Sequence, residues 1–166
     1  SGVKALLYVA QPGMEGGNAL ADVLSGDVTP SGKLTDTWAA AYEDFPNSGT
    51  FSHNNGNVNT EKYEEGIYVG YRYFDSFQVE PVYPFGYGLS YTEFETACSR
   101  VSSDGASVTA AVQVKNTGAT YAGKEVVQIY ASCPQKGMAK EYRRLCAFAK
   151  TSLLMPGQQE ELELTF

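Results

Sequence analysis

The pattern of hydrophobic and polar residues changes near the middle of the chain. Residues 3–10 are nearly all apolar, which is typical of a strand covered on both faces of an α/β sheet. A turn rich in glycine and proline follows at 11–17, and the next apolar stripe predicts a helix that Asn18 caps and Gly26 ends. Residues 33–38 predict a second short strand. The first part should therefore be a strand-turn-helix-strand fragment of an α/β sandwich.

Two further segments follow before the pattern changes. Residues 39–65 are polar and irregular, which predicts a long loop, and loops of this length are usually functional or mobile. Aromatic and small residues alternate at 66–74, which predicts a strand or an extended arm, and residues 75–78 predict a turn.

From Phe94 onward, apolar residues recur at every second position. Val108, Ala110, Val112 and Val114 share one face, and similar alternation recurs in three later segments, at 126–131, 145–149 and 162–166. Short strands separated by turns at this spacing predict an all-β antiparallel sandwich. The Cys-Trp-Cys hallmark of antibody domains is absent from this half of the sequence.

The two halves meet in an aromatic run at residues 83–91, YPFGYGLSY. A flexible linker would be polar and rich in glycine and serine, so this run predicts a packed contact between domains, here called the seam. We place the domain boundary at its end. Residues 1–90 are then the α/β portion with its long loop and the seam, and residues 91–166 are the β-sandwich.

Composition narrows the possible partners. The 166 residues carry a net charge of -7 at pH 7, which argues against binding to nucleic acid or to an anionic membrane. No apolar run approaches the roughly 20 residues that a membrane span needs. The three cysteines are scattered, which favours a reducing compartment such as the cytoplasm, and a single histidine leaves no histidine cluster for a metal.

Both ends suggest a piece of a longer polypeptide. The chain begins almost directly with the apolar segment at 3–10, and its last strand still alternates at Phe166. One strand-helix-strand unit cannot bury both faces of a sheet, so we expect the remaining strands in sequence outside this chain. The exposed sheet edge leaves a homo-oligomer open as an alternative.

Three residues are candidates for binding a ligand. Gln11 and Glu15 lie in the turn beyond the first predicted strand and at the start of the helix, where α/β folds place ligands. The turn matches neither dinucleotide nor P-loop spacing, and Glu15 could simply complement the helix dipole. His53 lies in the polar loop, where it could hydrogen-bond a hydroxylated ligand or be an ordinary surface histidine. The acidic residues at 43–75 select no catalytic pair, and a solvated acidic loop is the alternative.

Several motifs, taken together and in order, resemble family 3 glycoside hydrolases of the β-glucosidase type. They lie in the turn and helix, in the segment after it, in the two aromatic runs and in the sandwich: 12–24 (PGMEGGNALADVL), 26–34 (GDVTPSGKL), 65–75 (EGIYVGYRYFD), 84–91 (PFGYGLSY), 125–130 (EVVQIY) and 156–158 (PGQ). The resemblance implies that the sandwich is of the immunoglobulin-like, fibronectin type III-like kind. The loop sequences at 42–46 and 51–56 are similar to those of bacterial members with a permuted domain order.

The resemblance also implies which domain supplies each catalytic residue. A barrel domain carries the nucleophilic aspartate, and the general-acid glutamate lies earlier in the α/β sandwich than Val3, so no catalytic residue is expected in this chain. The parent would be a retaining, exo-acting β-glycosidase, with a β-linked glucoside or oligosaccharide as substrate and neither metal nor cofactor. Gln11, Glu15 and His53 are then candidates for lining the sugar pocket. The isolated chain should be inactive; a carbohydrate- or protein-binding module without hydrolase activity is the alternative.

Overall fold

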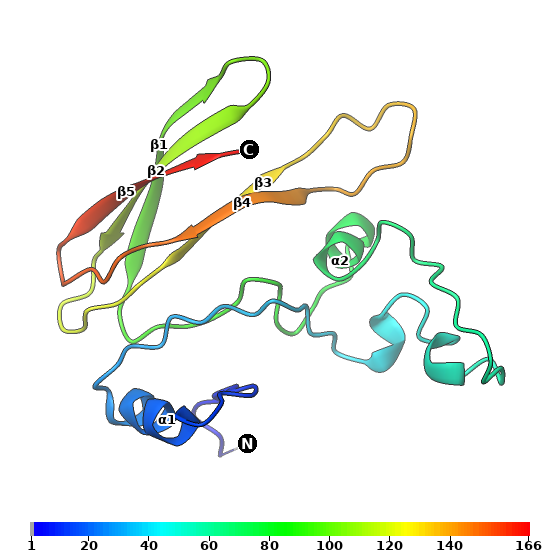
Figure 1. The fold of residues 1–166 in the computed structure, drawn as a ribbon, viewed down its shortest axis with the longest axis horizontal. Coiled ribbons are helices and arrows are strands. Elements are labelled where there is room, and N and C mark those ends of the chain that lie inside the picture. The colour runs from blue at the N-terminus through cyan, green and yellow to red at the C-terminus, as the bar shows by residue number, and fades with distance from the viewer. Residues whose placement is uncertain (1) are drawn as a thin grey trace.

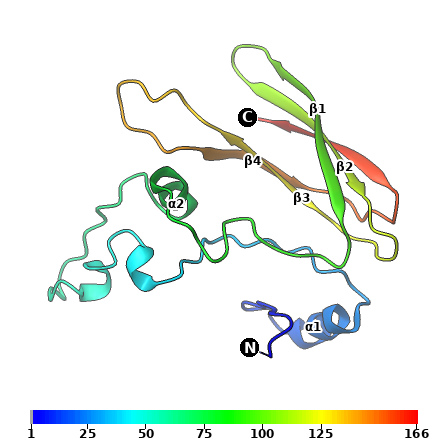
Figure 2. The same ribbon diagram turned by 180° about the vertical axis from the view of Figure 1, so that it is seen from behind.

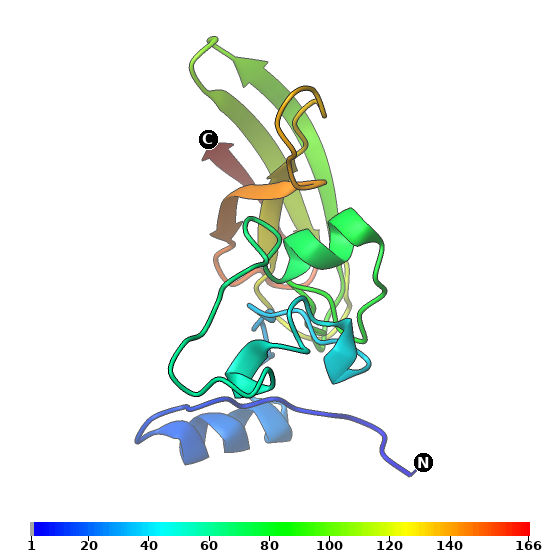
Figure 3. The same cartoon turned by 90° about the vertical axis from the view of Figure 1, so that its right-hand side faces the viewer.

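The computed structural model describes residues 2–166. Helices and loops form one layer and the strands form another, with α2 lying between them, as Figure 1 shows from the front and Figure 3 from the side. The elements in chain order are α1 (Gly16–Ser25), the 3₁₀ helices η1 (Tyr42–Asp44) and η2 (Phe51–His53), α2 (Tyr71–Phe77), β1 (Phe94–Ser103), β2 (Val108–Asn116), β3 (Val126–Ala131), β4 (Arg144–Lys150) and β5 (Gln159–Thr165).

The strands form the antiparallel sandwich that the sequence predicts. One sheet has the order β1-β2-β5, and the second pairs β3 with β4 (Figure 2). The period-two pattern of β2 buries Ala110, Val112 and Val114 on its inner face. Val112 and Val114 pack with Val127 of β3 and Leu164 of β5, so the core lies between the two sheets.

The polar side chain of Asn116 is fully buried at the end of β2, with an exposed fraction of 0%. Its Oδ1 accepts hydrogen bonds from Thr92 Oγ1 at 2.7 Å and from the Gly118 amide at 3.0 Å. Its Nδ2 donates to the carbonyl oxygens of Tyr121 and Leu154, both at 2.9 Å. Asn116 thus joins loops that flank the sandwich, and every buried polar atom of its side chain has a partner.

Helix α1 ends where the sequence predicts but begins earlier. Gly26 closes it in the left-handed conformation, with φ of 87°. Asn18 does not cap the helix, because α1 already begins at Gly16, where the amide bonds to the Gly13 carbonyl at 3.2 Å. Asn18 Nδ2 donates instead to the carboxylate of Glu15 at 2.6 Å.

The two strands expected at 3–10 and 33–38 do not pair with each other. Residues 3–10 form no strand, and Leu6 remains 69% exposed. A strand needs a neighbouring backbone to complete its ladder, and no ladder joins this segment to the rest of the described chain. Residues 33–38 are held by the seam, through a bridge between Trp38 and Tyr83.

The strand or extended arm expected at 66–74 is wrong for residues 71–74, as is the turn at 75–78 for residues 75–77, because helix α2 occupies 71–77. Gly70 at φ of 56° lets the chain turn sharply just before the helix. The aromatic residues then repeat at helical spacing, so that Tyr73 and Phe77 stack at 5.0 Å and Phe74 is buried. No helix of the described chain has the length and apolar character of a membrane span.

Candidate functional site

The seam packs against the extended segment at 33–38. The Leu34 amide donates to the Tyr87 carbonyl at 2.8 Å, and the Trp38 amide donates to the Tyr83 carbonyl at the same distance. The Trp38 ring contacts Tyr83 edge-on at 5.8 Å and Tyr8 at 5.1 Å. These contacts join the seam to the segment at 33–38 through aromatic rings and main-chain hydrogen bonds.

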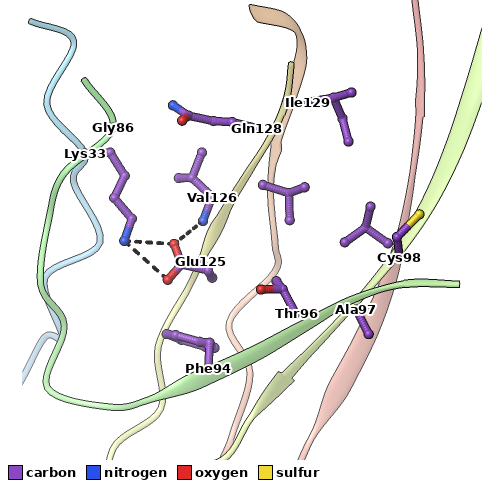
Figure 4. Close-up of a pocket in the computed structure, with 12 residues that line it drawn as sticks. Lys33, Gly86, Phe94, Thr96, Ala97, Cys98, Glu125, Val126, Gln128 and Ile129 are labelled. Atoms are coloured by element: carbon purple, nitrogen blue, oxygen red, sulfur yellow. Dashed lines mark hydrogen bonds and ion pairs between the residues drawn. The ribbon is translucent and has the colours of Figure 1, made fainter. Parts of the chain in front are cut away.

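An ion pair continues this contact into the β-sandwich (Figure 4). Lys33 Nζ lies 2.9 Å from Glu125 Oε1 and 3.3 Å from Oε2, and it also donates to the Gly88 carbonyl at 2.8 Å. Glu125 Oε1 accepts the Val126 amide at 2.6 Å, at the start of β3. The Lys33 and Glu125 side chains are only 17% and 19% exposed. The pair therefore fastens the α/β portion to the first residues of β3.

A cavity of about 410 Å³ lies beside this ion pair, between β1 and β3. Its walls combine apolar side chains, such as Phe94, Val112 and Ile129, with polar ones, such as Thr96 and Gln128. The charged atoms at its edge are already paired with each other.

A second contact joins α2 to the β3–β4 hairpin. The Arg143 guanidinium donates to both carboxylate oxygens of Asp75, at 2.6 and 3.2 Å, and lies 4.9 Å from the centre of the Tyr130 ring. The hydrogen bond that Arg143 donates to Asp75 raises the pKa of Arg143, and burial raises the pKa of Tyr130. The Tyr71 hydroxyl accepts the Leu145 amide at 2.8 Å. Both contacts hold α2 against the sandwich.

The structure does not gather the predicted site residues into one place. Gln11 and Glu15 are exposed beside α1, whereas His53 lies in η2 at the other end of the helical layer (Figure 1). His53 Nδ1 lies 2.9 Å from the carbonyl oxygen of Asn57 and 3.9 Å from Glu61 Oε2. None of the three lines the cavity of Figure 4. Their role in binding stays a prediction.

The residues that form the two ion pairs between the α/β portion and the sandwich were not predicted from the sequence. Lys33 and Glu125 lie 92 positions apart, and Asp75 and Arg143 lie 68 apart, so no local spacing reveals either pair. Within residues 2–166, no group of three histidine, cysteine or acidic side chains is close enough to hold a metal ion. The effect of the two contacts is mechanical, because they fix the α/β portion against the β-sandwich.

Comparison with known proteins identifies both portions. Residues 1–71 match the glycosyl hydrolase family 3 C-terminal domain, and residues 125–166 match the fibronectin type III-like domain. A β-glucosidase of Ruminococcus albus is 48% identical over 96% of this chain, and a probable β-glucosidase I of Aspergillus niger is 41% identical over 97%. These alignments cover 16% and 20% of the two relatives.

Solved structures agree with this assignment. β-Glucosidase 3B of Thermotoga neapolitana, in complex with glucose, has a TM-score of 0.85 and 47% identity over 91% of this chain and 21% of its own. The β-glucosidase of Kluyveromyces marxianus, also with glucose, has a TM-score of 0.85 and 39% identity over 92% of this chain and 18% of its own. The chain thus spans about a fifth of such relatives. It belongs to glycosyl hydrolase family 3, as a C-terminal α/β portion followed by a fibronectin type III-like sandwich.

Proposed function

We propose that the chain is the non-catalytic brace of a retaining, exo-acting β-glucosidase. The observation that carries this proposal is the pair of cross-contacts, Lys33–Glu125 and Asp75–Arg143. They occur in a chain of which 96% aligns with a β-glucosidase at 48% identity. Each contact joins the α/β portion to the sandwich. Such a part would hold the catalytic domains in fixed relative positions without contacting the glycosidic bond that is cleaved.

The chemistry proposed for the parent is double displacement. One carboxylate attacks the anomeric carbon while a second, about 5 Å away, protonates the leaving group and then activates water. Both carboxyl groups would come from the barrel and from the rest of the α/β domain. Neither a metal nor an organic cofactor takes part in these steps.

The remaining α/β domain is the proposed partner of residues 3–10. Their side chains are apolar and exposed here, as Leu6 at 69% and Tyr8 at 59% illustrate. Pairing with neighbouring strands would bury them. The isolated chain should self-associate through this segment, and sedimentation velocity against concentration would detect it.

The activity is tested on the full-length parent polypeptide with an aryl β-glucoside. Hydrolysis should occur, an aryl α-glucoside should be left intact, and proton NMR should find β-glucose as the first sugar released. Release of α-glucose first would contradict the retaining mechanism. A folded parent that binds glucosides without hydrolysing them would instead identify a carbohydrate-binding module.

We further propose that Gln11, Glu15 and His53 line the sugar pocket of the parent. Their support is exposure on the surface of the α/β portion and, for Glu15, the N-cap position of α1. Alanine at each should raise KM or lower kcat, whereas Glu95→Ala, an exposed change on β1, should alter neither. Unchanged kinetics with a lower melting temperature would assign the three residues to structure.

A bacterial source is also proposed. The loops at 42–46 and 51–56 support it, as does the higher identity to the Ruminococcus albus relative than to the Aspergillus niger one. In the permuted domain order that those loops suggest, the barrel follows the sandwich. The gene sequence on both sides of this segment would show whether the barrel precedes or follows the sandwich.

A further inference from the structure

The loop around η2 contains a reactive dipeptide, Asn55–Gly56. Among the asparagines of the sequence, Asn55 alone is followed by glycine. Residues 51–60 are all exposed to solvent. Glycine has no side chain to shield its backbone nitrogen, so this nitrogen is the least hindered one that an asparagine side chain can meet.

The local geometry holds the Asn55 side chain close to the backbone that follows it. The Asn57 amide donates to Asn55 Oδ1 at 2.9 Å, so the side-chain amide turns toward the main chain of the next two residues. This hydrogen bond also draws electron density from the Asn55 side-chain carbonyl carbon. Oδ1 is therefore held by the amide one residue beyond Gly56, whose nitrogen would attack.

Gly56 lies in a hydrogen-bonded turn whose backbone is strained. Its amide donates to the His53 carbonyl at 2.8 Å, a bond that must open before the nitrogen can react. Two non-glycine residues at this turn have positive φ, Ser52 at 56° and His53 at 66°. Such conformations are strained, so opening the turn releases strain as it breaks the hydrogen bond.

We propose that Asn55–Gly56 is a site of spontaneous covalent modification to aspartate and isoaspartate. The Gly56 backbone nitrogen attacks Asn55 Cγ and loses its proton, and ammonia leaves, which closes a cyclic succinimide. Water then adds to either ring carbonyl. Opening at Cγ gives aspartate, and opening at the former backbone carbonyl gives isoaspartate, with one extra methylene in the main chain. Water is the only co-reactant.

The structure holds a matched dipeptide that should resist the same reaction. Asp104–Gly105 lies in the turn between β1 and β2, where Asp104 Oδ1 accepts the amides of Ala106 and Ser107 at 2.9 and 2.8 Å. Hydrogen bonds from the backbone of Ser107 and Ala106 lower the pKa of Asp104, so the carboxylate stays ionised. A carboxylate anion is a much poorer electrophile than an amide.

Other asparagines are protected in different ways. Asn116 is fully buried and its side-chain amide is held by hydrogen bonds on both Oδ1 and Nδ2. Asn57 is followed by Val58, whose β-branched side chain crowds the backbone nitrogen. Conversion should therefore be concentrated at Asn55. It would add one negative charge beside His53 and Glu61 and lengthen the loop backbone there.

The test is to incubate the purified chain in mildly alkaline buffer for days, then map its peptides by mass and label isoaspartate with an isoaspartyl methyltransferase. The peptide holding Asn55 should convert at least roughly tenfold faster than any other asparagine, and Asp104–Gly105 should stay unlabelled. In Asn55→Gln, whose longer side chain would need a larger ring, the label should disappear.

Outcomes of two kinds, in the peptide map and in the rate of the folded chain, would overturn the proposal. One is conversion of another asparagine as fast as Asn55, or a label that persists in Asn55→Gln. The other concerns the fold, since the folded loop should react within about tenfold of the rate in urea. A folded chain that reacts more slowly than this would mean that the turn protects Asn55.

Discussion

Asn116→Ala is expected to lower the free energy of unfolding of the chain by about 2–4 kcal/mol, since buried polar groups that lose their partners are costly. The carbonyls of Tyr121 and Leu154 would lose their donor, and the Thr92 hydroxyl and the Gly118 amide would lose their acceptor. The site is closed to solvent, so water cannot easily replace the lost amide. Urea unfolding followed by circular dichroism would measure the change.

Asn18→Ala is the matched control for this experiment. Asn18 is exposed on α1, and its side chain has a single hydrogen bond, to Glu15. Its replacement should change the free energy of unfolding by no more than about 0.5 kcal/mol. If both alanine variants had equally small effects, the hydrogen-bonded centre at Asn116 would not be what holds the loops to the sandwich.

Lys33→Met is expected to destabilise the contact between the α/β portion and the sandwich by about 1–3 kcal/mol, because it leaves a half-buried carboxylate without its cation. Glu125 would keep only the hydrogen bond from the Val126 amide. Lys33→Met combined with Glu125→Gln should recover part of the loss, since the uncompensated charge is then gone. Urea unfolding of the two single variants and the double variant gives the coupling free energy.

Arg100→Met provides the control for this second prediction. Arg100 pairs with Glu163, but the two side chains are 61% and 59% exposed. Exposed ion pairs contribute only about 0–1 kcal/mol, so this variant should be close to the unmodified chain. A loss as large as that of Lys33→Met would show that neither pair is special to the domain contact.

The sandwich could be predicted from the sequence because its signal is local. Val112 and Val114 alternate with exposed residues, and that alternation directly sets which face of β2 is buried. Gly26 was predictable for the same reason, since a helix end with positive φ favours glycine. Helix α2 was missed because Tyr73 and Phe77 fit either an alternating or a helical reading, and only the conformation of Gly70 decides between them.

The rest depends on contacts that sequence spacing does not encode. The apolar pattern at 3–10 predicts a buried strand, but a ladder also requires a neighbouring backbone, which the described chain does not provide. Lys33 and Glu125 meet only once the seam has brought β3 beside the α/β portion. Gln11, Glu15 and His53 remain predictions, because a pocket that they would line needs the rest of the parent.

The rate of aryl β-glucoside hydrolysis by the purified chain, measured beside the full-length parent at equal molar concentration, decides whether the chain is non-catalytic. We expect turnover by the parent and none above the buffer background by the chain, because we propose that both reacting carboxyl groups belong to the other domains. Steady turnover that co-purifies with the chain would be the opposite result. If replacing one of the chain's own acidic residues also abolished this turnover, the chain would itself be catalytic.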